Sequence, residues 1–366
     1  GGHPVDALRY EEPLKVLKDG ATQGFFENLI KKCLLNNSHQ ALVIALPQPG
    51  LSEQKEKQSV EALQAWKAQQ SEETLLQVIA ESKELEKRQG APDSPEQLAT
   101  IPLLDRKDLK VEPDFPVWQE KKLENQVTEL TQELFTSRIL YLSLYFDTHI
   151  VEQKDVPYLQ LVTALLGRMN TSRRPYSDLS NEINLRSGGL SFSHWAVGDK
   201  AEGSIYHPRF TVKTKMLGED LAGALELLEE IRLETRFDDS KRLKELIAEA
   251  RARWESSLSE MGQQLATGRL ASYLSEQGAY NDLSQLPFYR FLKELDDQFD
   301  ERKTEIQESL KRVCEMIFRQ PNLLINRVGG KDEIQAANQL LPQFLEKFPK
   351  EILPKANYKF DVKPLN

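Results

Sequence analysis

At 366 residues the chain is longer than one ordinary hydrophobic core requires, so we expect two or more domains. Charged residues make up 29% and apolar residues 39%, which is typical of a soluble, helix-rich protein. No apolar run approaches the roughly 18 residues that a membrane span needs. Because the net charge is −9 and the basic residues are interspersed with acidic ones, a nucleic-acid groove is not expected either.

The first fifty residues predict the end of an αβ unit. Apolar residues recur at helical spacing in FFENLIKKCLL (25–35), and an Asn-Asn-Ser turn ends that helix. The apolar run ALVIALP (41–47) predicts a short buried strand. One helix and one strand cannot close a core. We therefore interpret residues 1–50 as the C-terminal remnant of an αβ domain that lies upstream of Gly1.

Residues 51–119 predict a different kind of structure, a helical hairpin followed by an extended strap. Two charged helices are expected within 52–90, with Ser71 as the N-cap of the second. A narrow apolar seam would join them, formed by Leu63, Trp66, Leu75, Ile79 and Leu85. The hairpin is interpreted as a rigid hinge between two lobes, with a solvated spacer as the alternative. Five prolines then break regular structure up to residue 118, which predicts a surface strap.

Residues 120–350 predict a complete αβ domain. Strands are expected at 136–147, 190–198, 204–216 and 322–330. Helices are expected at 155–169, 175–187, 219–237, 240–260, 288–299, 301–318 and 331–348. This order predicts an α+β sandwich, an antiparallel-rich sheet with helices stacked on one face. The closing residues 351–366 are expected to link to an absent domain.

The two cysteines carry little functional information. Cys33 and Cys314 are far apart in the sequence, and each lies in an apolar helical context. We expect two buried free thiols rather than a disulfide or a metal pair.

Several segments, taken in series, carry a resemblance to a known family. They are RYEEPLKVLK, FFENLIKKCLLNNSHQ, QGAPDSPEQLATIPLLDRKDL and LFTSRILYLSLYFDT…VPYLQLVTALLG…YSDLSNEINLRSGGLSFS. In order and spacing the chain resembles the insulinase/pitrilysin-type zinc metallopeptidases, in the presequence-protease branch. The resemblance implies four homologous αβ domains in two bowl-shaped halves, joined by a helical hairpin around a chamber that degrades peptides. This chain would then hold the end of the second domain, the hairpin and strap, and the whole third domain.

The zinc motif of such enzymes is missing from this sequence. The motif is His-x-x-Glu-His on a helix, where two histidines one turn apart bind one metal ion and the Glu activates the bound water. The nearest match begins at His149 and contains Glu152, but Gln153 stands where the second histidine is needed.

The resemblance also implies which residues stand at the ligand positions. It places Tyr158, Leu161 and Val162 at the ligand positions of the helix expected near 157–167. Glu245 and Glu249 lie on the helix that would carry the third ligand, without histidine partners. We therefore expect no catalytic residue, no metal and no cofactor in this chain. The resemblance implies zinc in the missing N-terminal domain of the parent protein.

The Gly-Gly pair before the strand expected at 190–198 is the best candidate for a functional site. It most simply ends a helix and permits a tight turn. The resemblance adds that the following strand lines the chamber, where an exposed edge would accept a peptide backbone. The candidate substrate-chamber residues are Gly188, Gly189, Leu190, Ser191, Phe192, His194 and Trp195.

The sequence thus predicts the non-catalytic central region of a zinc metalloendopeptidase, which supplies chamber wall and hinge. Its partners would be a peptide substrate and the missing N-terminal and C-terminal domains, with no nucleic acid and no membrane. The alternative is a non-enzymatic binding or assembly subunit of the same superfamily, as in processing-protease or respiratory-complex core subunits. A helical scaffold explains the αβ repeats less well. We expect a bacterial cytoplasm, with an organelle matrix as the alternative.

Overall fold

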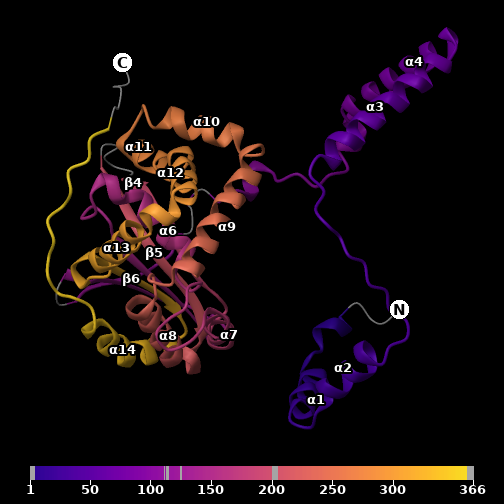
Figure 1. Ribbon diagram of the computed structural model, residues 1–366. Helices are drawn as coiled ribbons and strands as arrows, with labels where there is room; N and C mark the ends of the chain where they lie inside the picture. Colours follow the sequence, from indigo (N-terminus) through magenta and orange to yellow (C-terminus); the bar gives the residue numbers. More distant parts are fainter. Residues whose placement is uncertain (1–4, 111, 113–114, 124–125, 200–204, 361–366) are drawn as a thin grey trace. The chain divides into compact units, whose positions relative to one another are not determined.

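The chain is described from a computed structural model that covers residues 5–110, 112, 115–123, 126–199 and 205–360. It divides into two compact units, Gly1–Lys110 and Val111–Asn366 (Figure 1).

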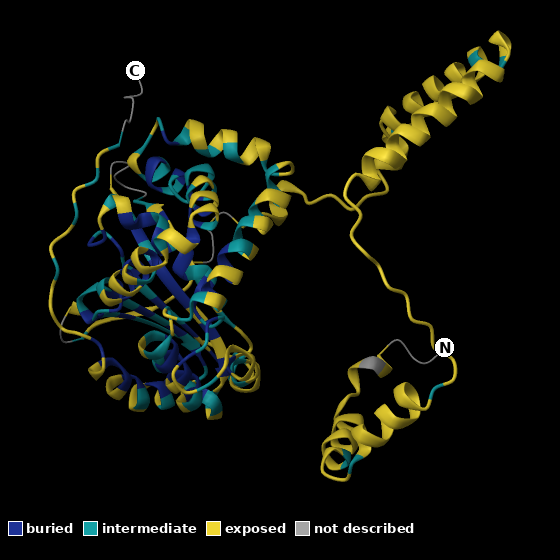
Figure 2. Ribbon diagram, viewed as in Figure 1, coloured by how far each residue is buried: buried dark blue, intermediate teal, exposed yellow. Residues whose placement is uncertain are grey.

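The first unit is helical. Its α-helices are α1 (Glu11–Ala21), α2 (Phe25–Ile30), α3 (Leu51–Gln69), α4 (Glu72–Gly90) and α5 (Pro95–Leu98). A π-helical turn, Lys31–Leu35, continues α2, and short 3-10 turns lie at Asp6–Leu8 and Arg106–Asp108. None of the side chains described for this unit is buried (Figure 2). The apolar faces of α1 and α2 are therefore open within the unit.

The buried strand predicted at 41–47 is wrong. These residues form no strand, and Leu42 and Val43 are 86% and 87% exposed. A strand needs the backbone groups of a neighbour to complete its hydrogen bonds. The described residues of this unit contain no other strand that would supply them.

The two helices predicted within 52–90 are present as α3 and α4. The side chain of Ser71 accepts a hydrogen bond from the Thr74 amide at 3.2 Å, which is the predicted N-cap. The chain enters and leaves this pair of helices at the same end (Figure 1). The seam residues remain largely exposed, with Leu63 at 65% and Trp66 at 45%.

The second unit is built on a six-stranded mixed sheet with the strand order β1-β2-β6-β3-β5-β4. Its strands are β1 (Gln119–Lys122), β2 (Thr128–Glu133), β3 (Ile139–Asp147), β4 (Leu190–Gly198), β5 (Tyr206–Leu217) and β6 (Leu323–Gly329). The β2–β6 pair is parallel and all other pairs are antiparallel. The predicted α+β class is confirmed.

Nine α-helices accompany this sheet in the part of the chain that the structure describes. They are α6 (Val156–Leu165), α7 (Tyr176–Arg186), α8 (Leu221–Glu234), α9 (Ser240–Leu258), α10 (Gly262–Ala271), α11 (Glu276–Asp282), α12 (Leu286–Asp297), α13 (Phe299–Ile317) and α14 (Lys331–Glu346). None of the described helices of the chain is long and apolar enough to cross a membrane.

The core lies on one face of this sheet. Along β3 the residues Leu140, Leu142, Leu144 and Phe146 are buried, while the residues between them are partly exposed. Buried side chains of α6, α8, α13 and α14 join the same core (Figure 2). Because side chains alternate along a strand, the opposite face of β3, β4 and β5 presents its own set of side chains. We call this second surface the open face.

Four elements of the second unit were not predicted. The strands β1 and β2 read QEKK and TELTQE, which lack the apolar alternation that signals a strand. Helices α10 and α11 are short and mostly polar.

The C-terminal segment 351–366, expected to be a linker, is attached to the second unit as far as it is described. The Tyr358 hydroxyl donates to the carbonyls of Thr148 and Val151 at 3.2 and 2.6 Å. The rings of Tyr358 and Phe360 pack on a small second core. That core consists of Val156, Ala196, Tyr206 and Tyr280.

Candidate peptide-contact surface

The Gly-Gly pair occupies the tight connection between α7 and β4, as predicted. Helix α7 ends at Arg186, and Gly189 has a φ of +118°, a conformation that side-chain-bearing residues rarely adopt. The Gly188 amide donates to the Lys215 carbonyl at 2.8 Å, and the Gly189 amide to the Ser187 hydroxyl at 3.2 Å. Since both amides are occupied, this turn is not a backbone cradle for an anion.

An open hollow of about 340 Å³ lies beside this turn on the open face. We call it the Gly-Gly hollow. Its lining consists of Tyr141, Ser143, Gly188, Gly189, Leu190, Ser191, Lys213, Thr214 and Lys215. Four of the seven candidate residues are thus brought together with three strands of the sheet.

Strand register explains which side chains meet at the hollow. Lys213 lies opposite Ser191 on β4 and opposite Ser143 on β3. Two residues further along β5, Lys215 lies opposite Tyr141. Lys213 therefore has a serine opposite it on each adjacent strand, and Lys215 has a tyrosine opposite it on β3.

The other three candidates, Phe192, His194 and Trp195, do not lie on one surface. This corrects the prediction for Phe192 and His194. Trp195 is 46% exposed, whereas His194 is buried and Phe192 packs on Phe210 with ring centroids 6.2 Å apart. The period of two along a strand puts Phe192 and His194 on the helix side. The alternation that separates Phe192 and His194 from Trp195 can be read from the sequence, but only the structure shows which side is buried, as Ala196 is.

His194 belongs to a buried polar network rather than to a surface. Its Nε2 lies 2.8 Å from the Tyr280 hydroxyl, which in turn lies 3.0 Å from the Thr148 hydroxyl. Burial lowers the pKa of His194 to about 3, so the imidazole is neutral near pH 7. These contacts give His194 a structural role.

The edge of β4 is partly closed, a feature that sequence reasoning missed. At Ala196 the amide donates to the Asn281 side-chain oxygen at 2.7 Å. The carbonyl accepts from the amide groups of Asn281 and Gln277 at 3.0 and 3.2 Å. These side chains of α11 take the place of a neighbouring strand. A peptide that adds to this edge therefore has only the Leu190 end of β4 to pair with.

The residues at the expected zinc-ligand positions do not fit a metal ion. Helix α6 carries Tyr158, Leu161 and Val162, and all three side chains are buried. On α9, Glu249 is bonded to Arg168 and Arg253, each at 2.6 Å. In the described part of the chain no three His, Cys, Asp or Glu side chains lie close enough together to hold a metal.

The near-motif around His149 is also occupied by protein contacts. His149 Nδ1 lies 2.9 Å from the Asp147 carboxylate, which also pairs with Arg209 at 2.8 Å. Burial works against the charge of Asp147, but the hydrogen bond from His149 and the charge of Arg209 lower its pKa overall. This carboxylate is a structural anion.

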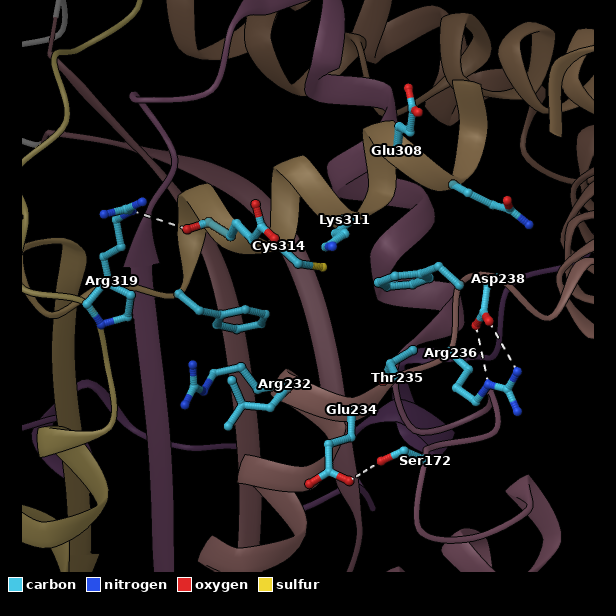
Figure 3. Close-up of a pocket in the computed structure, with 16 residues that line it drawn as sticks. Ser172, Arg232, Glu234, Thr235, Arg236, Asp238, Glu308, Lys311, Cys314 and Arg319 are labelled. Atoms are coloured by element: carbon cyan, nitrogen blue, oxygen red, sulfur yellow. Dashed lines mark hydrogen bonds and ion pairs between the residues drawn. The ribbon is translucent and has the colours of Figure 1, made fainter. Parts of the chain in front are cut away.

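A larger hollow of about 750 Å³ lies between the end of α8 and α13 (Figure 3). In its wall Arg236 and Asp238 form an ion pair at 3.1 Å, and Glu234 accepts a hydrogen bond from the Ser172 hydroxyl. Cys314 lies in its wall, and burial raises the pKa of this thiol. A thiol held protonated is a poor nucleophile, so the hollow has no catalytic cysteine.

Both cysteines are free, as predicted, but only Cys314 is buried. Cys33 is exposed, because the π-helical turn that carries it has no covering element within its unit.

Comparison with known proteins identifies the class. A family described as associated with the peptidases of family M16, subfamily C, matches residues 46–295, and the chain belongs to this family. The match covers the hairpin, the strap and most of the sheet unit.

Individual relatives agree with this assignment. The chain is 32% identical over 362 residues to protein HypA of Clostridium perfringens, covering 99% of the chain and 37% of HypA. It is 27% identical over 351 residues to presequence protease 1, chloroplastic/mitochondrial, of Arabidopsis thaliana, covering 94% of the chain and 32% of that protein. The mitochondrial presequence protease of Drosophila melanogaster is 25% identical over 249 residues, covering 67% of the chain and 24% of that protein. The chain therefore spans between 24% and 37% of the length of these relatives.

Proposed function

We propose that this chain is the non-catalytic central region of a zinc metalloendopeptidase. It would form part of the wall of a peptide-degrading chamber and the hinge between its halves. One observation carries the proposal. In a chain similar to presequence proteases over most of its length, the expected ligand positions hold Tyr158, Leu161 and Val162, which pack in the core. The zinc, the N-terminal domain and the C-terminal domain would belong to the parent protein.

The domain roles follow from the same proposal. Residues 1–50 would complete an upstream αβ domain, because the apolar faces of α1 and α2 need a partner surface. The α3–α4 hairpin would be the hinge, and residues 351–366 would lead to the next domain. The Gly-Gly hollow and Trp195 would contact peptide on the chamber side.

The alternative of a non-enzymatic assembly subunit predicts the same core-packed α6. The hairpin favours the protease, because the matched family region begins at residue 46 and includes both hairpin helices. We propose a bacterial cytoplasm as the compartment, supported by the similarity to a clostridial protein.

The test is to purify this chain and assay it with a quenched fluorogenic peptide while measuring bound zinc by atomic absorption. We expect neither turnover nor stoichiometric zinc, because no residue set in the described part of the chain fits the metal. Mixing the chain with a matching N-terminal half that contains His-x-x-Glu-His should restore turnover. Chelator-sensitive cleavage by the chain alone would overturn the proposal.

A further inference from the structure

The Gly-Gly hollow carries positive charge in a chain whose net charge is −9. Lys213 and Lys215 are both exposed on the open face, and the lining of the hollow contains no carboxylate. Among the described residues neither ammonium group has an ion-pair partner. Asp147 lies on the same face of β3, but it is already bonded to Arg209 at 2.8 Å. No described carboxylate is therefore bonded to either lysine.

The fold also sets the direction of one of these lysines. A Cβ built on Gly188 would lie 2.8 Å from Lys215 Cε and 3.0 Å from its Cγ. The stem of Lys215 thus lies directly against the Gly188 backbone, in space that a side chain would fill. Glycine at this position leaves the space in which the Lys215 stem lies, and a larger residue would displace that stem.

The spacing of the two charges matches an extended peptide. Residues two apart on a strand point to the same face and lie about 7 Å apart. Carboxylates at positions i and i+2 of an extended segment have the same spacing, so both would reach Lys213 and Lys215 together. The hydroxyl of Ser143, opposite Lys213 on β3, would donate to the same carboxylate.

From these observations we infer that the Gly-Gly hollow binds acidic segments of an extended peptide, with carboxylates at alternate positions. The inference rests on the proposed function, because it names the peptide class that this wall would contact. The proposed occupant is a peptide, because its carboxylates would complement the charges of Lys213 and Lys215 and would have the same spacing as these residues along the strand.

The inference can be tested by fluorescence anisotropy with this chain and three short fluorescein-labelled peptides. One carries Asp at positions i and i+2, the second carries Asn there, and the third carries Asp at adjacent positions. We expect the first peptide to bind about tenfold more tightly than the second, as two charge pairs predict. The third should bind more weakly than the first, because adjacent side chains of an extended peptide point to opposite faces.

Matched charge reversals locate the binding. K213E/K215E should weaken the first peptide about tenfold or more, whereas K241E/K303E makes the same charge change on the exposed sides of α9 and α13 and should not. Gly188→Ala should give an intermediate loss, because its Cβ displaces Lys215 without changing any charge. Added salt should reduce the difference between the Asp and Asn peptides. Circular dichroism would check that each variant is folded.

Three results would overturn the inference: equal binding of the Asp and Asn peptides, equal weakening by both double variants, or no binding of any peptide. Competition by inorganic phosphate or by anionic vesicles as strong as that by the Asp peptide would instead show a general anion site. None of these results would affect the proposal that the chain is non-catalytic, which depends on zinc content and turnover alone.

Discussion

The helices of the two units differ in how far their apolar residues are buried. Helix α1 has a strongly amphipathic sequence, yet Leu14 and Leu17 are 42% and 40% exposed within its unit. In the second unit α6 lies on the sheet, and Leu159 and Leu161 are fully buried. An apolar stripe on a helix is stabilising only when another layer covers it. The first unit therefore exposes apolar helix faces that another layer of structure would have to cover.

The largest expected difference concerns ion pairs. Glu129 and Arg327 form a buried pair at 2.9 Å in the second unit, whereas Lys57 and Glu61 form an exposed one at 3.9 Å on α3. Arg327→Met should lower the free energy of unfolding by about 3–5 kcal/mol, because it leaves a buried carboxylate uncompensated. Lys57→Met should cost about 0.5 kcal/mol or less. Urea denaturation followed by circular dichroism measures both. Similar losses for the two variants would contradict the contrast between the units.

A second contrast concerns apolar side chains. Leu161→Ala removes a fully buried side chain and should cost about 2–5 kcal/mol. Leu63→Ala, on the exposed seam of the hairpin, should cost about 0.5 kcal/mol or less when this chain is studied alone. Urea denaturation of both variants measures the two losses. A large effect of Leu63→Ala would show that the seam is buried in solution.

The buried imidazole gives a pH-dependent contrast. Because the pKa of His194 is lowered to about 3 in the folded state, the unfolded chain binds a proton that the folded chain excludes between about pH 3 and 6.5. Stability should therefore fall as the pH drops through this range, by up to about 1.4 kcal/mol per pH unit. In His194→Gln this contribution should be absent, which denaturation at several pH values would measure. His39→Gln, on the exposed first unit, is the matched control. An unchanged pH dependence in His194→Gln would contradict the assignment.

The smallest expected effect concerns two segments without regular structure. Residues 41–47 are exposed, whereas 355–360 are attached to the second unit through Tyr358. Hydrogen exchange should be fast in the first segment and slower in the second. Tyr358→Phe removes the hydroxyl bonds and should cost about 1 kcal/mol, with faster exchange confined to the C-terminal segment. Equal exchange in both segments of the unmodified chain would disprove the attachment.

Local patterns in the sequence were sufficient for much of this fold. The apolar alternation of β3, the Ser71 N-cap and the Gly-Gly end of α7 each depend on neighbouring residues only, and each is present. The strands β1 and β2 lack such a pattern. Tertiary contacts hold them instead: β1 pairs with β2, β2 pairs with β6, and Glu129 of β2 forms an ion pair with Arg327 of β6. The predicted strand at 41–47 failed for the converse reason, since its composition is suitable but the described residues of its unit offer no partner strand.

For the candidate surface, too, some features follow from the sequence and others only from the tertiary structure. The sequence by itself placed the Gly-Gly turn and the strand after it, and it determined that no His-x-x-Glu-His motif is present. Only the tertiary structure brought Lys213 and Lys215 beside that turn, buried His194, and closed the β4 edge with Asn281. The physical reason is that a strand's own sequence fixes which residues share a face. Its register with neighbouring strands, and the helices packed on it, decide what that face contacts.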